Sequence, residues 1–291
     1  MSAFWQDVQI FPFLQYALVT GVLTAIACGI IGTYVAVRRI TYIAGAIAHC
    51  TLGGMGVARY CQKVLGLDFL SPLLGAMIAA LLAAVIIGLV TLYGKEREDT
   101  VLSAVWSLGM AIGIFFISRT PGYNEDLMSY LFGNILIVGK NDLYLVAGLD
   151  AVIVVVSMVF YNKLLVVCFD EEFAWLRGLH VQFYYLLLLC LTAVTVVLLT
   201  QVVGIVMVIA MLTLPAAAAA RFVGRLWQMI VLAILLSMLC NVGGLALSYA
   251  PDLPTGATII LLAGFVYVIS LFVGGPSKRL FTQAMGHELG R

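Results

Sequence analysis

The stretch Phe169–Val181, FDEEFAWLRGLHV, is a short charged island between two long apolar segments. Asp170 can accept hydrogen bonds from the free amides of a helix start, and Glu171 and Glu172 lie where the helix dipole favours negative charge. Gly178 provides a C-terminal stop for such a helix. The stretch therefore predicts a short helix, about two turns long, that lies outside the bilayer.

One side of this predicted helix is apolar. Phe169, Phe173 and Leu176 fall at helical spacing, framed by the acids and by Arg177. Such a ridge could dock into another protein. The plainer alternative is an amphipathic loop helix that rests on its own membrane domain. The helix pattern alone is compatible with both interpretations.

The composition of the whole chain is that of a membrane protein with several spans. Hydrophobic residues make up 64% and charged residues 10% of the chain, and the mean hydropathy is +1.13. These values lie far outside the range of soluble globular proteins. The 291 residues leave no room for a separate soluble domain, so we predict one transmembrane domain over residues 1–291. A net charge of +1 without a Lys/Arg-rich tail gives no reason to expect nucleic acid as a partner.

Apolar windows along the chain predict the spans. The nine windows are Phe13–Val37, Tyr42–Tyr60, Leu70–Tyr93, Val101–Ser118, Leu143–Tyr161, Phe183–Val203, Gly204–Phe222, Leu226–Tyr249 and Gly256–Val273. The window Leu127–Gly139 is apolar but too short to cross, which favours a re-entrant or interfacial segment on the outer side. We therefore predict an all-α polytopic membrane protein with about eight to nine transmembrane helices.

The basic residues predict the orientation of these spans. With sides alternating, eleven of the fifteen Lys and Arg residues fall on the cytosolic side, which is the bias that the positive-inside rule expects. They are Arg38, Arg39, Lys95, Arg97, Lys163, Arg177, Arg221, Arg225, Lys278, Arg279 and Arg291. We predict that the N-terminus is outside, that the C-terminus is inside, and that Phe169–Val181 is cytosolic.

Small residues recur where helices would need to approach one another closely. Gly109 and Gly113 form a GxxxG pair, and Gly53, Gly54 and Ala58 lie along one side of the second predicted span. Small side chains at such positions allow two helix backbones in a membrane to come into contact. We interpret these residues as sites of tight helix packing.

An ionisable side chain inside a span indicates a structural or functional role, because inserting a charged side chain into the centre of the membrane costs about 2.5–3.5 kcal/mol. His49 lies mid-span in YIAGAIAHCTLGG, next to Cys50. Imidazole and thiolate are ligands for zinc and other divalent transition metals, so one interpretation is a transient ligand in a transport pathway. The other interpretation is a histidine that only forms a hydrogen bond with a neighbouring helix.

Asp150 is the one acid that lies well inside a predicted span. It could help to coordinate a cation, pair with His49, or belong to a helix that is shifted so that the acid reaches water. The chain has neither a GxxxxGK[ST] phosphate loop nor an HExxH motif. Nucleotide hydrolysis by phosphate-loop chemistry is therefore expected in another subunit, if anywhere.

Several strings taken together resemble the membrane permeases of ABC importers for zinc, manganese and iron. In chain order they are RRITYIAGAIAHCTLGG, EDTVLSAVWSLGMAIGIFF, FDEEFAWLRGLHV, VVGIVMVIAMLTLPAAAAAR and PTGATIILL. The similarity runs from Leu14 to Val273. The resemblance implies a transport subunit rather than an enzyme, in the bacterial inner or plasma membrane, that passes zinc or manganese by alternating access and holds no permanent cofactor.

The same resemblance implies partners and residue roles. Two copies of the chain would form a homodimer, with a cytosolic ATP-binding subunit on each copy and an extracytoplasmic metal-binding protein that delivers the ion. Phe169–Val181 matches the cytosolic coupling segment of the family, and His49 matches a histidine in a helix implied to line the metal path. The family acid four residues earlier would fall at Gly45. The ion would then meet His49 with another partner, such as Cys50 or Asp150, or pass with fewer protein ligands.

Two other functions stay open from the sequence. One is a secondary metal carrier driven by an ion gradient, although such a carrier usually needs several intramembrane acids or histidines in relay. The other is an intramembrane enzyme that uses His49 and Asp150 as an acid–base pair. The sequence does not choose between zinc, manganese and iron.

Overall fold

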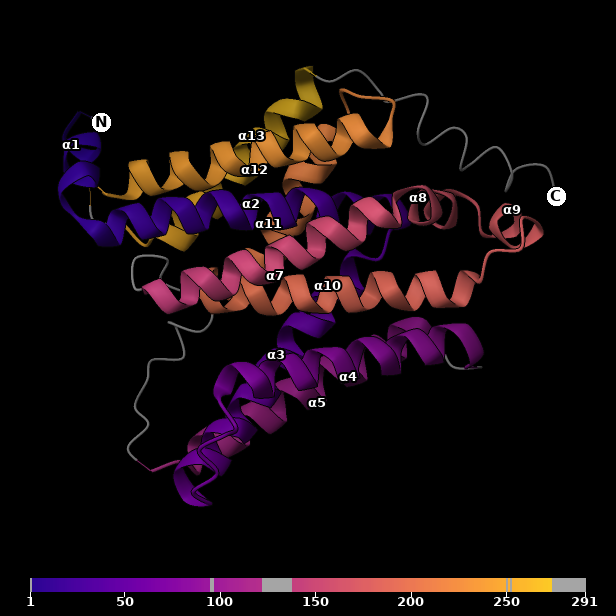
Figure 1. Cartoon of the computed structure of the whole chain (residues 1–291), viewed down its shortest axis with the longest axis horizontal. Helices are drawn as coiled ribbons and strands as arrows, with labels where there is room; N and C mark the ends of the chain where they lie inside the picture. The colour runs from indigo at the N-terminus through magenta and orange to yellow at the C-terminus, as the bar shows by residue number, and fades with distance from the viewer. Residues whose placement is uncertain (1, 95–96, 122–137, 250, 252, 274–291) are drawn as a thin grey trace. The chain divides into compact units, whose positions relative to one another are not determined.

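The computed structural model describes residues 2–94, 97–121, 138–249, 251 and 253–273, and these residues form helices joined by short connections (Figure 1). The helices are α1 (Ser2–Ile10), α2 (Pro12–Arg38), α3 (Thr41–Val64), α4 (Pro72–Tyr93), α5 (Glu98–Ser118), α7 (Lys140–Val159), α8 (Tyr161–Phe169), α9 (Glu171–Leu176), α10 (Val181–Val203), α11 (Ile205–Ala219), α12 (Leu226–Tyr249) and α13 (Thr255–Val273). The described residues contain no strand, so the predicted all-α class is confirmed.

Each predicted span corresponds to one of these helices, but fewer of them meet the length and composition of a membrane span. Among the described residues, seven helices are long and apolar enough to cross a membrane: α2, α4, α5, α7, α10, α12 and α13. α3 is long enough, but glycines and polar side chains lower its hydropathy, and α11 has only 15 residues. Most of the predicted re-entrant segment Leu127–Gly139 lies outside the described residues.

The chain divides into two compact units. The first consists of residues 1–39, 134–181 and 210–291, and the second of residues 40–133 and 182–209. The first unit therefore contains α1, α2, α7, α8, α9, α12, α13 and most of α11, and the second contains α3, α4, α5 and nearly all of α10. Along the chain, the first unit gives way to the second directly after Arg39 and again directly after Val181.

In the first unit, α2 is the central helix and packs against α7, α8 and α12 (Figure 1). Its side chains from Ala27 to Val35 are all buried. Gly29 permits the close approach to α12, because a Cβ at this position would lie 2.6 Å from the backbone nitrogen of Ile234. The end of α2 at Arg38 therefore belongs to a rigidly packed helix.

In the second unit, α3 packs against both α4 and α5. A Cβ on Gly53 would lie 2.7 Å from the carbonyl oxygen of Gly109, and a Cβ on Gly56 would lie 2.7 Å from that of Gly113. Gly54 faces the backbone of Gly75 in α4 just as closely. The small residues thus bring helix backbones into direct contact, and the predicted tight packing is confirmed.

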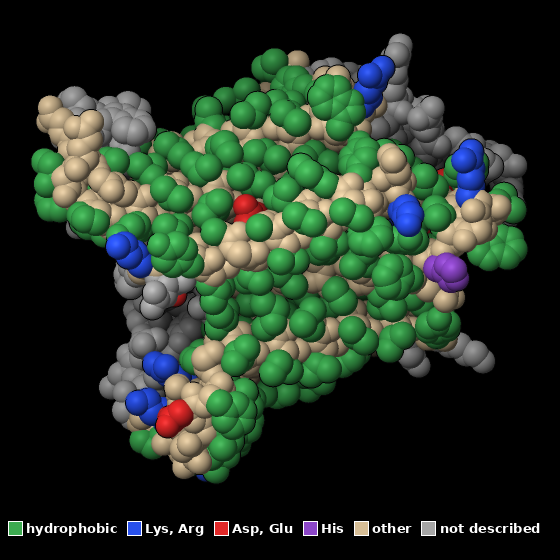
Figure 2. All heavy atoms as spheres, in the orientation of Figure 1, with side chains coloured by type: hydrophobic (Ala, Val, Ile, Leu, Met, Phe, Trp, Pro, Cys, Tyr) green, Lys and Arg blue, Asp and Glu red, His purple; other side chains and the backbone are tan. Residues whose placement is uncertain are grey.

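The surface of the helices is largely apolar, as expected of a multi-pass membrane protein. Figure 2 shows hydrophobic side chains over most of the face in view, with a few charged side chains between them. Leu261 of α13 is 75% exposed and Leu108 of α5 is 62% exposed. Such large apolar side chains are normally shielded from water, so these helix faces are suited to contact with lipid or with other membrane helices.

Candidate functional site

The charged island folds as predicted into a helix of its own, α9. Asp170 caps it, since its Oδ1 accepts a hydrogen bond from the backbone amide of Phe173 at 2.9 Å. Glu171 and Glu172 occupy the first turn, where the free amides of the helix start favour negative charge. The start of α9 is therefore determined by local residues alone.

The end of α9 is determined in the same way, by a glycine in a left-handed conformation. Gly178 has a φ of +74°, which side chains with a Cβ rarely adopt. Its amide donates to the carbonyl of Trp175 at 2.9 Å, and the amide of Leu179 donates to that of Ala174 at 3.1 Å. These two hydrogen bonds form a Schellman motif and confirm Gly178 as the C-terminal stop.

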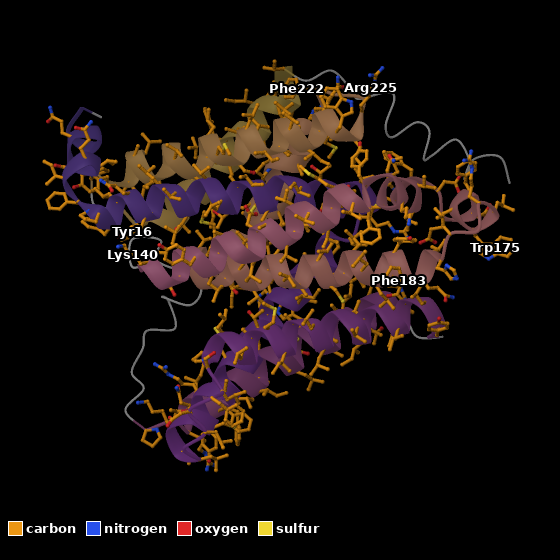
Figure 3. The ribbon with its side chains drawn as sticks, viewed as in Figure 1. Tyr16, Lys140, Trp175, Phe183, Phe222 and Arg225 are labelled. Atoms are coloured by element: carbon orange, nitrogen blue, oxygen red, sulfur yellow. The ribbon has the colours of Figure 1, made fainter. Side chains whose placement is uncertain are left out.

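Three large apolar side chains of α9 are exposed, and we call them the docking surface: Phe173 (43% exposed), Trp175 (72%) and Leu176 (75%). Only Ala174 of this helix is buried. The guanidinium of Arg177 lies 4.9 Å from the centre of the Phe173 ring. Trp175 is labelled in Figure 3. The helix does not bury its large apolar side chains against the described part of its own chain, which argues against the interpretation as an ordinary loop helix.

The exposed apolar side chains of α9 differ from the predicted ridge at two residues. Phe169 is not part of it, because Asp170 takes an extended conformation (φ −154°, ψ 101°) that separates α8 from α9. Phe169 is the last residue of α8 and is partly buried. Trp175 was not predicted, because it is two residues from Phe173 and off the ridge spacing. A helix as short as α9, with one buried residue, exposes more than one face.

The end of α2 is tied to α8 and α9 by Arg38. Its guanidinium forms an ion pair with the carboxylate of Glu171, and its Nη1 donates a hydrogen bond to the carbonyl of Val167 at 3.5 Å. Burial raises the pKa of the neighbouring Cys168 thiol to about 12, and the charge of Arg38 acts in the opposite direction. One arginine therefore joins the central helix of the first unit to the helix that carries the docking surface.

His49 has a defined orientation in the second unit. Its Nδ1 lies 2.8 Å from the carbonyl oxygen of Gly45, one turn earlier in α3. Because a carbonyl only accepts, Nδ1 carries a proton in this hydrogen bond, and Nε2 takes no part in it. The ring also stacks on Trp106 of α5, with 4.3 Å between centroids. The hydrogen bond goes to its own helix rather than to a neighbouring one, and one nitrogen is left able to bind a metal.

Cys50 also contacts α5. Its thiol donates a hydrogen bond to the carbonyl of Val105 at 3.1 Å, and the residue is partly buried. It lines an apolar cavity of about 430 Å³ between α3, α4 and α5. A thiol must lose its proton and this hydrogen bond before it can act as a metal ligand.

Asp150 lies in the middle of α7 and is 4% exposed. This buried position does not support the alternative of a shifted helix whose acid reaches water. Asp150 belongs to the first unit, whereas His49 and Cys50 belong to the second. Within the part of the chain that the structure describes, no group of three or more His, Cys, Asp or Glu side chains is placed to hold a metal ion. The predicted metal ligands stay a prediction.

Comparisons with known proteins connect these features to a family. A sequence model described as the ABC 3 transport family matches residues 10–274. A protein of Chlamydia trachomatis described as a probable metal transport system membrane protein is 42% identical over 262 residues, which cover 90% of this chain and 89% of that protein. The manganese transport system membrane protein MntC of Halalkalibacterium halodurans is 33% identical over 284 residues, which cover 97% and 94%.

The fold is also found among solved structures. The structure described as PsaBC from Streptococcus pneumoniae in complex with Fab contains a chain that superposes on this one with a TM-score of 0.84. The two are 32% identical, and the superposition covers 97% of this chain and 99% of that chain. The similarity therefore extends over almost the whole length of both chains.

Proposed function

The chain belongs to the ABC 3 transport family, and from this premise we propose that it is the permease subunit of an ATP-driven importer for a divalent transition metal. The single observation that carries the proposal is α9, a capped helix with three exposed apolar side chains in a chain that is otherwise built of apolar helices. A permease without a nucleotide-binding motif needs such a surface, because the work of ATP hydrolysis must reach it from another subunit. The chain itself is thus a transport subunit and not an enzyme.

The partners follow from this role. α9 docks into a cytosolic ATP-hydrolysing subunit, which requires the predicted orientation with α9 inside the cell. Two permease chains form the translocation path, and an extracytoplasmic metal-binding protein delivers the ion. The two permease copies expose the path alternately to either side of the membrane as ATP is bound and hydrolysed. The full-length similarity to metal transport membrane proteins supports this assembly.

Manganese is the first metal to test, because relatives of nearly equal length are named as manganese transport proteins. Zinc is the second, because the donors on α3 are a nitrogen and a sulfur, which suit zinc better than manganese. Iron is the third, because its preference for nitrogen, sulfur and oxygen ligands lies between those of manganese and zinc. Selectivity among the three then depends on how many oxygen ligands complete the transit site.

The proposal is tested with vesicles that contain the chain together with its ATP-hydrolysing subunit and binding protein. Uptake of manganese or zinc should require ATP and the ATP-hydrolysing subunit, and it should persist when ionophores collapse ion gradients. Uptake without that subunit would reject the importer, and uptake that follows the gradients would favour a secondary carrier. An intramembrane enzyme would show neither kind of uptake.

We predict that His49→Ala lowers the rate of metal uptake by at least about tenfold, while the ATP-hydrolysing subunit stays bound. The loss of a nitrogen ligand weakens the binding of the metal ion during transport. Even mutation of the residues that only orient metal ligands typically lowers metal affinity or activity by about 10–100-fold. The measurement is initial uptake of manganese and of zinc at several concentrations. Cys61→Ala, more than three turns along the same helix, serves as the control and should leave uptake unchanged. Equal rates for His49→Ala and the wild type would remove His49 from the pathway.

A further inference from the structure

We propose that Arg38 and Glu171 form the link that carries movement of α9 to α2. The inference rests on the proposed function, in which α9 is the helix on which the ATP-hydrolysing subunit acts. It adds the residues that pass this action into the membrane part of the chain.

The link begins at Glu171, the first residue of α9. Its carboxylate pairs with the guanidinium of Arg38, which is the last residue of α2. The side chain of Arg38 is 22% exposed and that of Glu171 is 43% exposed, so the pair is shielded mainly on the arginine side. Arg38 also holds the carbonyl of Val167 in α8. A displacement of α9 therefore acts on the end of α2 directly through a charged contact.

The next residue is conformationally exceptional. Arg39 has φ 61° and ψ 29°, and it is the one residue other than glycine with a positive φ in the described ranges of the chain. Its amide donates to the carbonyl of Ala36 at 3.2 Å and so closes the last turn of α2. A side chain with a Cβ is strained in this left-handed region, and such strain persists only where the surroundings hold it. Arg39 therefore ends α2, directly after the arginine of the ion pair, in a backbone conformation that its surroundings must hold.

The ion pair lies next to a boundary between the two compact units along the chain. The first unit ends at Arg39 and the second begins at Ile40. α3 follows from Thr41, and His49 lies about two turns into this helix. The chain passes into the second unit again after Val181, shortly beyond the end of α9. α9 is thus connected to both of these crossing points, to the one after Val181 through the chain and to the one after Arg39 through Arg38.

A contact that transmits movement differs from one that only stabilises the fold, and the difference is measurable. Loss of a transmitting contact lowers the amount of metal imported per ATP hydrolysed, while the folded complex and its ATP hydrolysis remain. Loss of a merely structural contact lowers stability or assembly instead. The ratio of uptake to ATP hydrolysis is therefore the decisive readout.

The experiment uses the complete transporter in vesicles with radioactive manganese, or zinc if zinc is the transported ion. The variants are Arg38→Gln, Glu171→Gln and the double variant. We expect each single variant to lower metal imported per ATP by at least about fivefold, the lower end of typical coupling between sites. The double variant should be no worse than Arg38→Gln alone, because that variant has already lost the contact between the two side chains. Arg38→Lys, which keeps the charge, should recover part of the loss.

The control is Arg225→Gln. Arg225 is an exposed arginine that precedes α12, labelled in Figure 3, and it lies on the same predicted side of the membrane. Its removal changes the net charge equally and should leave the ratio unchanged. If Arg38→Gln matches this control, if the two single losses add in the double variant, or if Glu171→Gln releases the ATP-hydrolysing subunit, the link is wrong. If Arg38→Gln does not fold, Glu171→Gln on the more exposed side of the pair decides the same question. A wild-type complex without ATP-dependent uptake would instead reject the proposed function.

Discussion

Replacement of Phe173 and Leu176 by serine together should release the ATP-hydrolysing subunit from the permease and stop metal uptake. Both side chains are exposed in the chain alone and would be buried in the docked complex. Burying a fully exposed large apolar side chain contributes about 1.5–3 kcal/mol, so burying the exposed 43% of Phe173 and 75% of Leu176 contributes about 2–3.5 kcal/mol in total. A loss of this size weakens the association by about one and a half to two and a half powers of ten. The measurement is the amount of the ATP-hydrolysing subunit that copurifies with the permease, together with ATP-dependent uptake.

The control for this prediction is Phe222→Ser. Phe222 is 50% exposed in the turn between α11 and α12, labelled in Figure 3, and it is an apolar side chain outside the docking surface. It should retain the ATP-hydrolysing subunit. α9 itself should still form, because its cap at Asp170 and its stop at Gly178 are untouched. If the ATP-hydrolysing subunit copurifies with the double variant as well as with the wild type, it binds outside the docking surface.

Replacement of Gly113 by valine should prevent stable folding of the second unit. A Cβ at this position would lie 2.8 Å from the carbonyl carbon of Leu52 and 3.0 Å from the amide nitrogen of Gly53. Both are backbone atoms, so no side chain can move aside, and α3 and α5 must separate. Overpacking typically costs about 1–3 kcal/mol, and the branched valine adds two more methyl groups to the contact. The midpoint of unfolding in detergent and the yield of membrane-inserted protein measure the effect.

The smaller change Gly113→Ala tests the same contact with a graded effect, and Gly148→Ala in α7 is its matched control. Nothing lies within 4 Å of a Cβ at Gly148. Alanine there should be neutral or should stabilise α7, because alanine is favoured over glycine in a helix by about 1 kcal/mol. If Gly113→Ala and Gly148→Ala shift the unfolding midpoint alike, close backbone contact between α3 and α5 is not what holds the second unit together.

Local patterns in the sequence were sufficient for the helices of the nine apolar windows and for both ends of α9, but they predicted neither α1 nor α8. Apolar windows marked the helices because a segment in lipid must satisfy its backbone hydrogen bonds within itself, and length and hydropathy therefore decide what can span. The cap at Asp170 and the stop at Gly178 were predictable because each forms hydrogen bonds within a few residues of itself. The predicted ridge went wrong at Phe169, since the same cap that starts α9 also interrupts the helical spacing.

The relations between distant residues were decided by the tertiary structure alone. The pairing of Arg38 with Glu171 joins positions 133 residues apart, and the stacking of His49 on Trp106 joins positions 57 residues apart. A single sequence contains no signal for either pairing, because hydrogen-bond patterns and hydropathy act locally, whereas these contacts depend on which helices pack together and in what register. The exposure of Trp175 and the separation of Asp150 from His49 into different units depend on packing for the same reason. The sequence alone determined that the chain is a multi-pass membrane protein with a short, separately capped helix between its apolar segments, and only the packing of helices decided what that helix is attached to.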